Sequence, residues 1–418
     1  NEFDLRYVAN TKTFMVKTAK GLQDLNKWMT GNMTTDVFKG KIKCDPANYV
    51  FNITEGSTNA KKQNITLAAN ITLPTVSNGE SNWIPIQYYQ GTFNGSNKTI
   101  RNLTIVDGTL SNIGLIGCLL SEGKVKDVNL ENVLIDSRSK VNPPYNKIGG
   151  IVGYSYADTD DDAEVSGCTV SGKIWGGFSC VGGIVGCTEN DNFIRDCTLV
   201  AGSELDAKDF TVGGIVGAMG TNCKVYNCNV SAKIGSYESE TAGGIVGRAG
   251  SGTRIEKCET AEGSEVKGNM RVAGILADSN SSSTNTCKVI DCINRSNVRL
   301  DMETSYEEYI GGIVADGNNI DITNCTNYGA LTSDDAVYMG GIIGKGPSCK
   351  LENCTNMETA TLTVTSKTSD QYTRLGGIIG YARYLVQVKG CMNHAAINHT
   401  YNRLKSCIGG IVGEMYNY

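Results

Sequence analysis

The sequence predicts an all-β protein: a right-handed parallel β-helix, a solenoid of about ten or more coils with a short N-terminal helical cap. Three observations predict it. One short phrase, apolar-Gly-Gly-Ile-Val-Gly or a close variant, returns ten times in the 418 residues. An apolar block ending in cysteine accompanies most copies, and the chain has 50 glycines but only six prolines. A recurring phrase of this period indicates stacked units that cannot bury their apolar faces alone.

The repeated phrase sets the length of a coil. With its second glycine as a marker, successive copies lie 29 to 38 residues apart. Glycine tolerates positive φ and close backbone approach, so the markers are expected at corners. Ile and Val are adjacent in the phrase, so either a corner turns both side chains inward or an apolar stripe is covered by another surface. The corner is favoured because monomers seldom expose such stripes. The markers are Gly114, Gly150, Gly183, Gly214, Gly244, Gly274, Gly312, Gly341, Gly377 and Gly410.

The block ending in cysteine predicts a strand. Val165–Cys168 and Ile194–Cys197 are typical examples. These runs are too short for helices, contain β-branched residues and are bounded by Gly, Asn, Asp and Ser. A third short block follows in many units, such as Lys173–Trp175. Each unit is therefore expected to contribute two or three strands to one coil of the solenoid.

The region before the array predicts a cap followed by the first coils. Thr18–Met29 places its apolar residues at helical spacing, and a helix there would cover the open end of the rod. We therefore divide the chain into residues 1–110, the cap helix and first coils, and residues 111–418, the repeat array of the same β-helix.

Three phrases in succession carry a resemblance to a known family: Trp83–Ile86, Gly91–Ile105 and Ile113–Gly117. Together with the repeats they resemble the GLUG-motif proteins, bacterial surface β-helices that are described as adhesin-like. The resemblance covers roughly residues 17–418 and includes the N-terminal helix. Similar repeats occur in the non-catalytic region of bacterial immunoglobulin A peptidases. The resemblance implies a cell-surface or secreted bacterial protein.

Composition argues against several classes of partner. The net charge is −5 and the Lys and Arg residues are scattered along the sequence, so no footprint for nucleic acid is expected. No apolar run reaches the length of a membrane span, so no membrane insertion within this chain is expected. The first residues lack the pattern of a signal peptide, which suggests a mature or excised fragment.

The cysteines predict a buried ladder of free thiols. Eight of the 16 occupy one repeat position, where the first unit has Val128. An apolar residue at that position indicates that the side chains face inward. A strained bridge between adjacent ladder cysteines is sterically conceivable, and a zinc site is disfavoured because no paired C-x-x-C pattern exists. The eight are Cys168, Cys197, Cys228, Cys258, Cys292, Cys325, Cys354 and Cys391.

Five of the eight cysteines outside that ladder follow patterns of their own. Cys223, Cys287 and Cys349 recur only in every second unit, and Cys118 and Cys187 also lie two units apart. Two coils correspond to roughly 9.6 Å, which is beyond the reach of a disulfide. We therefore expect these thiols to be free.

The sequence assigns no catalytic, cofactor-binding or metal-binding residue. Its only histidines, His394 and His399, have no carboxylate or cysteine at ligand spacing and are interpreted as surface residues. The densest acidic cluster consists of Asp158, Asp160, Asp161 and Asp162. A solvated insertion is favoured over a weak calcium site because the cluster does not match a calcium loop. A second insertion, residues 278–286, is rich in Ser and Asn and contains no acidic residue besides Asp278.

Aromatic residues suggest a binding role. Several occupy expected turns, where exposed rings provide platforms for sugars or proteins, although ordinary surface residues are the favoured interpretation. The hypothesis is a non-catalytic, adhesin-like protein that binds host or matrix glycans or glycoproteins. One alternative is a polysaccharide lyase or glycoside hydrolase with acids aligned across coils, and another is a passive stalk. The residues are Tyr154, Tyr156, Trp175, Phe178, Tyr237, Tyr306, Tyr309, Tyr338, Tyr372, Tyr381 and Tyr384.

Overall fold

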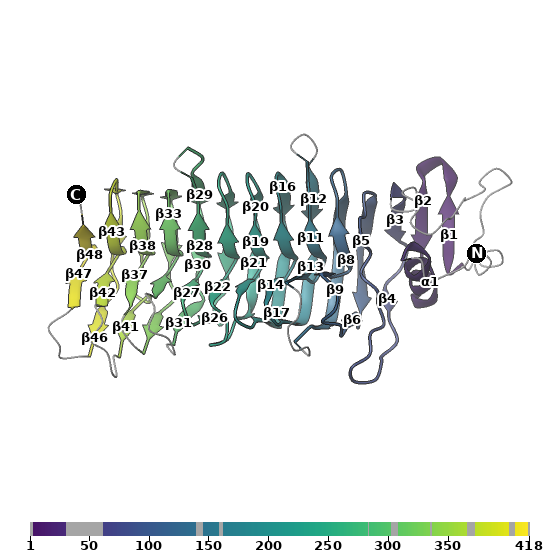
Figure 1. Cartoon of the computed structure of the whole chain (residues 1–418), viewed down its shortest axis with the longest axis horizontal. Coiled ribbons are helices and arrows are strands. Elements are labelled where there is room, and N and C mark those ends of the chain that lie inside the picture. Colours follow the sequence, from purple (N-terminus) through teal and green to yellow (C-terminus); the bar gives the residue numbers. More distant parts are fainter. Residues whose placement is uncertain are drawn as a thin grey trace.

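A computed structural model shows an elongated all-β solenoid of about ten turns, with the N-terminal elements at one end and the last coil at the other (Figure 1). The predicted fold class is confirmed. The structure describes residues 3–30, 62–138, 145–158, 162–282, 284–301, 308–334, 337–365, 373–400 and 406–416.

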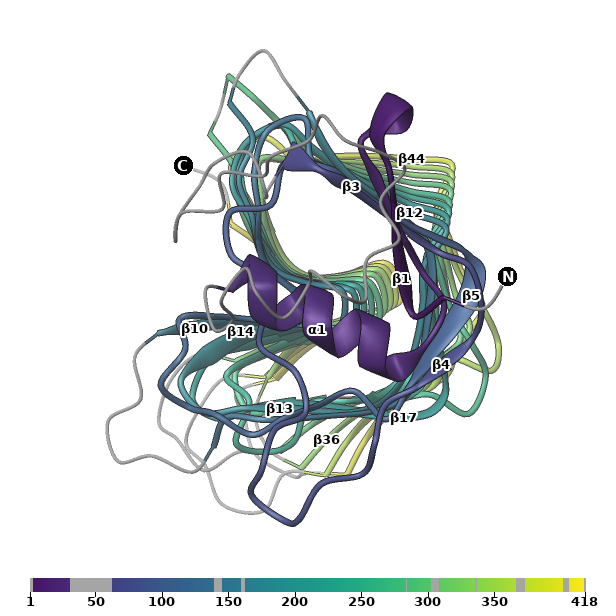
Figure 2. The ribbon, with the colours of Figure 1, turned by 90° about the vertical axis from the view of Figure 1, so that its right-hand side faces the viewer.

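The chain begins with elements that cover one end of the rod. Strands β1 (Leu5–Val8) and β2 (Thr13–Val16) pair antiparallel, and a 3-10 turn (Ala9–Thr11) joins them. Helix α1 (Ala19–Met29) follows and lies across the end of the solenoid in Figure 2. The Thr18 hydroxyl caps the helix by accepting the Gly21 N–H. The predicted helix is confirmed, whereas the preceding hairpin has no counterpart in the repeat and was not predicted.

Each coil passes through a large sheet and two smaller ones. Within the described residues the large sheet has 28 strands, and its pairings between coils are parallel. Its opening strands are β3 (Asn64–Leu67), β4 (Ile71–Thr72), β5 (Thr92–Arg101), β6 (Thr104–Ile105) and β9 (Lys124–Asp136). Its first wall continues with β12 (Ala163–Ser166), β16 (Asn192–Arg195), β20 (Lys224–Tyr226), β24 (Arg254–Glu256), β29 (Cys287–Ile290), β34 (Ile320–Thr323), β39 (Cys349–Glu352) and β44 (Gln387–Lys389).

The second wall of the large sheet follows the cysteine position in each coil. Its strands are β13 (Thr169–Gly176), β17 (Thr198–Ala207), β21 (Asn229–Ile234), β25 (Glu259–Thr260), β26 (Glu265–Gly268), β30 (Ile293–Asn294), β31 (Asn297–Leu300), β35 (Thr326–Asn327), β36 (Leu331–Ser333), β40 (Thr355–Asn356), β41 (Leu362–Val364), β45 (Met392–Asn393) and β46 (Ile397–His399). In the later coils two short strands replace one long strand, which places a turn between them.

Two ten-stranded sheets complete the coil on either side of the marker glycines. The sheet before the markers contains β7 (Asn112–Ile113), β10 (Asn146–Gly149), β14 (Ser179–Gly182), β18 (Thr211–Gly213), β22 (Thr241–Gly243), β27 (Arg271–Ala273), β32 (Tyr309–Gly311), β37 (Tyr338–Gly340), β42 (Thr373–Gly376) and β47 (Ser406–Gly409). The sheet after them contains β8 (Ile116–Leu119), β11 (Val152–Ser155), β15 (Val185–Thr188), β19 (Val216–Met219), β23 (Val246–Ala249), β28 (Leu276–Asn280), β33 (Val314–Asn318), β38 (Ile343–Pro347), β43 (Ile379–Arg383) and β48 (Val412–Tyr416).

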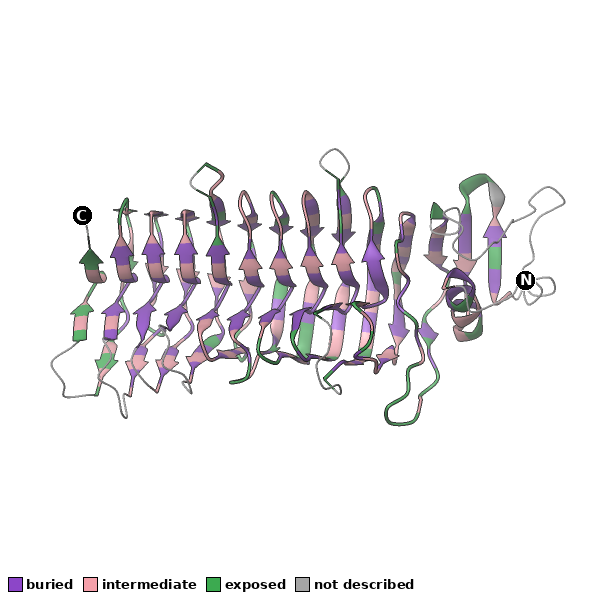
Figure 3. Cartoon of the chain, in the orientation of Figure 1, coloured by how far each residue is buried: buried purple, intermediate pink, exposed green. Residues whose placement is uncertain are grey.

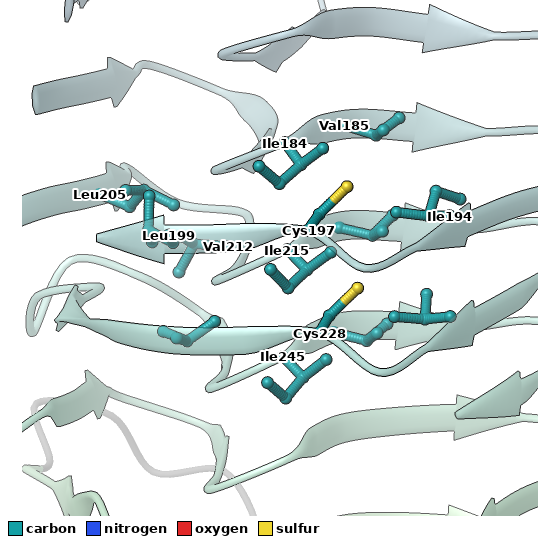
Figure 4. Close-up of a cluster of buried hydrophobic side chains, with 14 of the residues drawn as sticks. Ile184, Val185, Ile194, Cys197, Leu199, Leu205, Val212, Ile215, Cys228 and Ile245 are labelled. Atoms are coloured by element: carbon teal, nitrogen blue, oxygen red, sulfur yellow. The ribbon is translucent and has the colours of Figure 1, made fainter. Parts of the chain in front are cut away.

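The repeated phrase forms the corner between these two sheets. The N–H groups of both Ile184 and Val185 donate to the same carbonyl, that of Ile215 on the next coil. Because two successive N–H groups share one acceptor, the chain turns at this point. Both side chains therefore face inward and are fully buried (Figure 4). The predicted corner is therefore confirmed, and in the coils before the last the phrase exposes no apolar stripe; in the last coil Ile408 and Ile411 are exposed at the end of the rod.

A second corner precedes every ladder cysteine. The residue before the cysteine adopts a positive φ in each coil, as at Asp196 (φ 55°) and Asn227 (φ 52°). Asn, Asp and Gly tolerate this conformation best, and they occupy most of these positions. The turn redirects the chain and points the cysteine side chain into the core. Successive cysteines, such as Cys197 and Cys228, consequently point the same way from neighbouring coils (Figure 4).

The cysteine prediction agrees with the structure. The described cysteines are free, and seven of the eight ladder thiols are buried, the last, Cys391, being half-buried. Burial raises the pKa of the Cys168 and Cys228 thiols well above 9.0, so they remain protonated. Strand register also places Ile320 between Cys287 and Cys349, which separates those two cysteines by two coils.

The core also contains a polar ladder in the later coils. One inward position holds Leu199, Val230 and Thr260 in earlier coils and then Asn294, Asn327, Asn356 and Asn393. The Asn327 amide donates to Asn356 Oδ1 at 2.9 Å, and the same contact recurs between the other neighbours. The amides of Asn294, Asn327 and Asn393 also donate to the backbone carbonyl two residues later, so these rungs satisfy the polar groups of a turn. Figure 3 shows that buried residues recur in successive coils along the rod up to the last coil.

Candidate functional site

The outward side chains beside the marker glycines form a second packed layer, here called the outer seam. Alternate residues of the two ten-stranded sheets point outward, and near the corner these residues are glycines. A Cβ atom on Gly217 of β19 would lie 2.6 Å from the Gly186 carbonyl oxygen and 2.8 Å from that of Val181 on β14. Glycine thus lets the outer faces of the two sheets approach each other. Farther from the corner, larger side chains from the two sheets meet.

Three tyrosines stack along the seam on successive coils. The ring centroids of Tyr309 and Tyr338 lie 5.3 Å apart, and those of Tyr338 and Tyr381 lie 5.5 Å apart. Tyr309 and Tyr338 are only 4% and 8% exposed although they lie outside the main core. The expectation that these residues occupy turns is wrong: they lie in strands β32, β37 and β43. The sequence did not reveal this because no run of alternating apolar residues marks an outward aromatic position.

Cations contact the faces of these rings. The Lys345 ammonium lies 4.4 Å from the Tyr309 centroid and donates to its hydroxyl at 3.0 Å. The Arg374 guanidinium lies 4.4 Å from the Tyr338 centroid and 5.1 Å from the Tyr381 centroid. Such contacts hold both the ring and the cation in place. The seam is therefore an ordered polar-aromatic layer.

Two carboxylates occupy neighbouring coils of the seam. Asp278 on β28 and Asp316 on β33 are register partners, although the insertion that begins at Asp278 contains no other acid. The partner is 38 residues away in the sequence, and only coil stacking brings the two together. Burial raises the pKa of Asp316 above 3.8, and Lys345 and Arg271 oppose that shift.

Both carboxylates are ion-paired. Arg248 Nε lies 3.4 Å from Asp278 Oδ2, and Arg271 Nε lies 3.4 Å from Asp316 Oδ2. Both arginines also contact Glu240, at 3.2 and 3.6 Å. Paired acids on adjacent coils are what polysaccharide hydrolysis requires, but here each acid already neutralises a cation. The arrangement is consistent with a structural role that links coils.

An exposed aromatic cluster, here called the platform, adjoins the seam. It consists of Tyr145, Phe178 and Phe210, whose ring centroids lie 4.8 to 6.0 Å apart. Phe178 is 45% exposed and Tyr145 is 38% exposed. Lys147 and Arg248 flank the cluster, 5.5 Å from the Tyr145 centroid and 5.0 Å from the Phe210 centroid. Exposed rings rimmed by cations are suited to binding rather than to stability.

The Tyr145 hydroxyl holds the ring in place through a contact with a buried side chain. It lies 2.7 Å from the sulfur of Cys180, which is buried. Burial, together with this neighbouring sulfur, raises the pKa of the Tyr145 hydroxyl, so the group stays protonated at physiological pH. The ring therefore has one buried polar edge and one accessible surface.

The predicted acidic cluster is only partly within the described residues. Asp160 and Asp161 lie outside them, while Asp162 is exposed. Asp158 accepts a hydrogen bond from the Tyr156 hydroxyl at 3.2 Å, and its N–H donates to Ser121 Oγ at 2.7 Å. Among the residues the structure describes, no three His, Cys, Asp or Glu side chains are grouped so as to hold a metal ion.

Other predicted residues are placed more simply. His394 is exposed, whereas His399 is half-buried, lies near Ser406 and has its pKa lowered by burial. Tyr154 and Trp175 lie in strands β11 and β13, contrary to the expected turns. Tyr306 and Tyr372 fall outside the described residues. Within the described segments, no helix combines the length and apolarity needed to cross a bilayer.

Comparison with known proteins agrees with the motif seen in the sequence. The family model described as "The GLUG motif" matches residues 145–174. The chain carries the GLUG motif. Its match spans one coil, from the platform residue Tyr145 through the first ladder cysteine to β13.

Two further proteins are similar over larger regions. Halomucin from Haloquadratum walsbyi is 29% identical over 170 residues, which is 37% of this chain but only 2% of Halomucin. A crystal structure of a proposed immunoglobulin A1 protease from Bacteroides ovatus aligns with 92% of this chain and 84% of its own, with a TM-score of 0.41 and 17% identity.

Proposed function

We propose that this chain is a non-catalytic, adhesin-like module displayed on a bacterial surface or secreted, where it binds host or matrix glycans or glycoproteins. The platform carries the proposal. Tyr145 and Phe178 expose ring surface on neighbouring coils, and sugar rings and protein partners use such surfaces because binding them immobilises few rotatable bonds. The GLUG motif and the partial match to Halomucin support a surface role.

The experiment is a binding screen of the full chain against immobilised glycans, mucin and matrix proteins. We expect saturable binding that weakens about tenfold or more in Tyr145→Ala/Phe178→Ala, because buried aromatic contacts dominate interface energies. Tyr384→Ala is the matched control, since Tyr384 is 48% exposed and lies far along the chain from the platform. Equal losses in the platform and control variants would refute the proposed site. No binding across the whole panel would favour a passive stalk.

A second candidate function is polysaccharide cleavage, which the aligned acids Asp278 and Asp316 favour. We regard it as secondary because both carboxylates are ion-paired. Every polysaccharide retained in the screen is therefore incubated with the chain and checked for released oligosaccharides. Release that disappears in Asp316→Asn, with folding unchanged, would replace the binding proposal with an enzymatic one.

A further inference from the structure

One outward column of the large sheet aligns basic residues that are far apart in the sequence. Lys224, Arg254 and Lys288 are successive register partners on strands β20, β24 and β29. Asp321 and then Lys350 follow on the next two coils. We call Lys224, Arg254, Lys288 and Lys350 the basic strip. Neighbouring positions are about 4.8 Å apart along the rod.

This order departs from the charge pattern elsewhere on the same sheet. On the second wall, Lys173, Glu204, Lys233 and Glu265 are successive register partners, so charges alternate in sign from coil to coil. Lys173 and Glu204 form an ion pair at 3.6 Å. Opposite charges on adjacent strands stabilise a sheet, while like charges directly opposite one another destabilise it. Three consecutive cations therefore require an explanation other than the stability of the free protein.

The strip is not neutralised by its surroundings. Lys224, Lys288 and Lys350 are exposed, and none of them takes part in an ion pair in the described part of the chain. Arg254 is paired with Glu256 at 2.7 Å, and Asp321 interrupts the column. Even with both acids counted, the five aligned positions and Glu256 retain a net positive charge. An anionic partner would relieve the repulsion.

Aromatic side chains adjoin the strip. Phe193 precedes Lys224 in the column, and Tyr226 lies two residues after Lys224 on the same strand face. Both rings are half-buried, so part of their surface faces solvent. Lys257 lies 5.3 Å from the Tyr226 centroid and donates to its hydroxyl at 3.2 Å. Rings beside cations provide stacking surface next to charge, as binding sites for acidic sugars require.

We propose that the basic strip binds a linear acidic polysaccharide, carrying uronate or sulfate groups, that runs along the rod. This extends the proposed glycan-binding function to a second surface, so separate variants test the two. Where its cations are consecutive, the strip offers about one cation per 4.8 Å, whereas duplex DNA carries one charge per about 1.7 Å. That low density suits a polymer with charges spaced by whole sugar units rather than a nucleic acid.

The test measures binding of the full chain to polygalacturonate, dextran sulfate, neutral dextran and duplex DNA between 50 and 300 mM NaCl. The test variant is Lys224→Gln/Lys288→Gln. The control is Lys173→Gln/Lys233→Gln, which removes the same charge from the same sheet but at alternating positions. Thermal unfolding of each variant checks that the solenoid is intact.

We expect salt-sensitive binding to one or both acidic polymers, and the polymer preferred distinguishes carboxylate from sulfate recognition. Affinity should fall about tenfold in the strip variant and little in the control, with a shallower salt dependence. Three results would overturn the inference: equal effects in both variants, neutral dextran bound as well as the acidic polymers, or duplex DNA bound more tightly. Binding of a neutral glycan that depends on Phe178 but not on Lys224 would refute the inference about the basic strip. The same result would still support the proposed glycan-binding function of the platform.

Discussion

Replacing Asn327 by leucine tests whether the asparagine ladder stabilises the later coils. Asn327 is fully buried; it donates to Asn356 Oδ1 and exchanges hydrogen bonds with both backbone groups of Gly329. Leucine fits this position in an earlier coil, as Leu199. The Asn294 amide also donates to Asn327 Oδ1, so four buried groups would lose a partner. Each loss costs about 1–3 kcal/mol, and burial of the leucine would offset about 2 kcal/mol. We expect a net destabilisation of about 6 kcal/mol.

The assay is equilibrium urea unfolding followed by far-ultraviolet circular dichroism. Asn393→Leu is the control because Asn393, at the last rung, accepts from the Asn356 amide and exchanges hydrogen bonds with the Ala395 backbone but is half-buried, so water replaces the lost bonds. Its cost should stay below about 1 kcal/mol. A stability for Asn327→Leu within about 1 kcal/mol of the parent chain would refute the reasoning, since the ladder would then contribute no more than an apolar column.

Three further predictions concern the corner, the seam and the thiols. Gly341→Ala should prevent stable folding of the later coils, because the new Cβ would collide with the Gly377 carbonyl and the Asn356 side chain; unchanged thermal unfolding would contradict this. Asp316 has a raised pKa in the folded state, so the stability linked to its protonation is complete at low pH and is lost as the pH rises through the raised value. The unfolding temperature of Asp316→Asn relative to the parent should therefore increase as the pH rises above 3.8, and a constant difference would refute the assignment. N-ethylmaleimide should label half-buried Cys407 in the native protein and Cys258 only after unfolding, as peptide mass spectrometry will show; equally fast labelling would disprove the buried ladder.

Much of the fold could be predicted because the same local sequence signals recur in each repeat. The paired glycines specify one corner because neighbouring backbone atoms leave no room for a Cβ atom, and the residue before each cysteine specifies the other through a positive φ that few side chains allow. The apolar position in each block specifies which side chains face inward. Helix α1 could be predicted from apolar spacing and its Thr18 cap.

The candidate sites could not be predicted in the same way. Outward residues vary freely from copy to copy, so no periodic signal marks Tyr309 and Tyr338 as neighbours or pairs Asp278 with Asp316. The buried asparagines do leave a trace, because Cys-x-Asn recurs in the last four units. That trace was visible in the sequence, but its meaning depends on knowing that the cysteine corner turns the asparagine inward.

The sequence by itself determined the coil: its length, its corners, its inward thiols and the absence of any familiar catalytic motif. Tertiary structure alone decided which outward side chains meet, because residues about 30 positions apart become neighbours only when coils stack in a particular register. The platform, the outer seam and the basic strip all arise at that level. The conformational preferences of neighbouring residues determine the shape of each coil, whereas the stacking of coils determines which side chains form the surface on which a partner would bind.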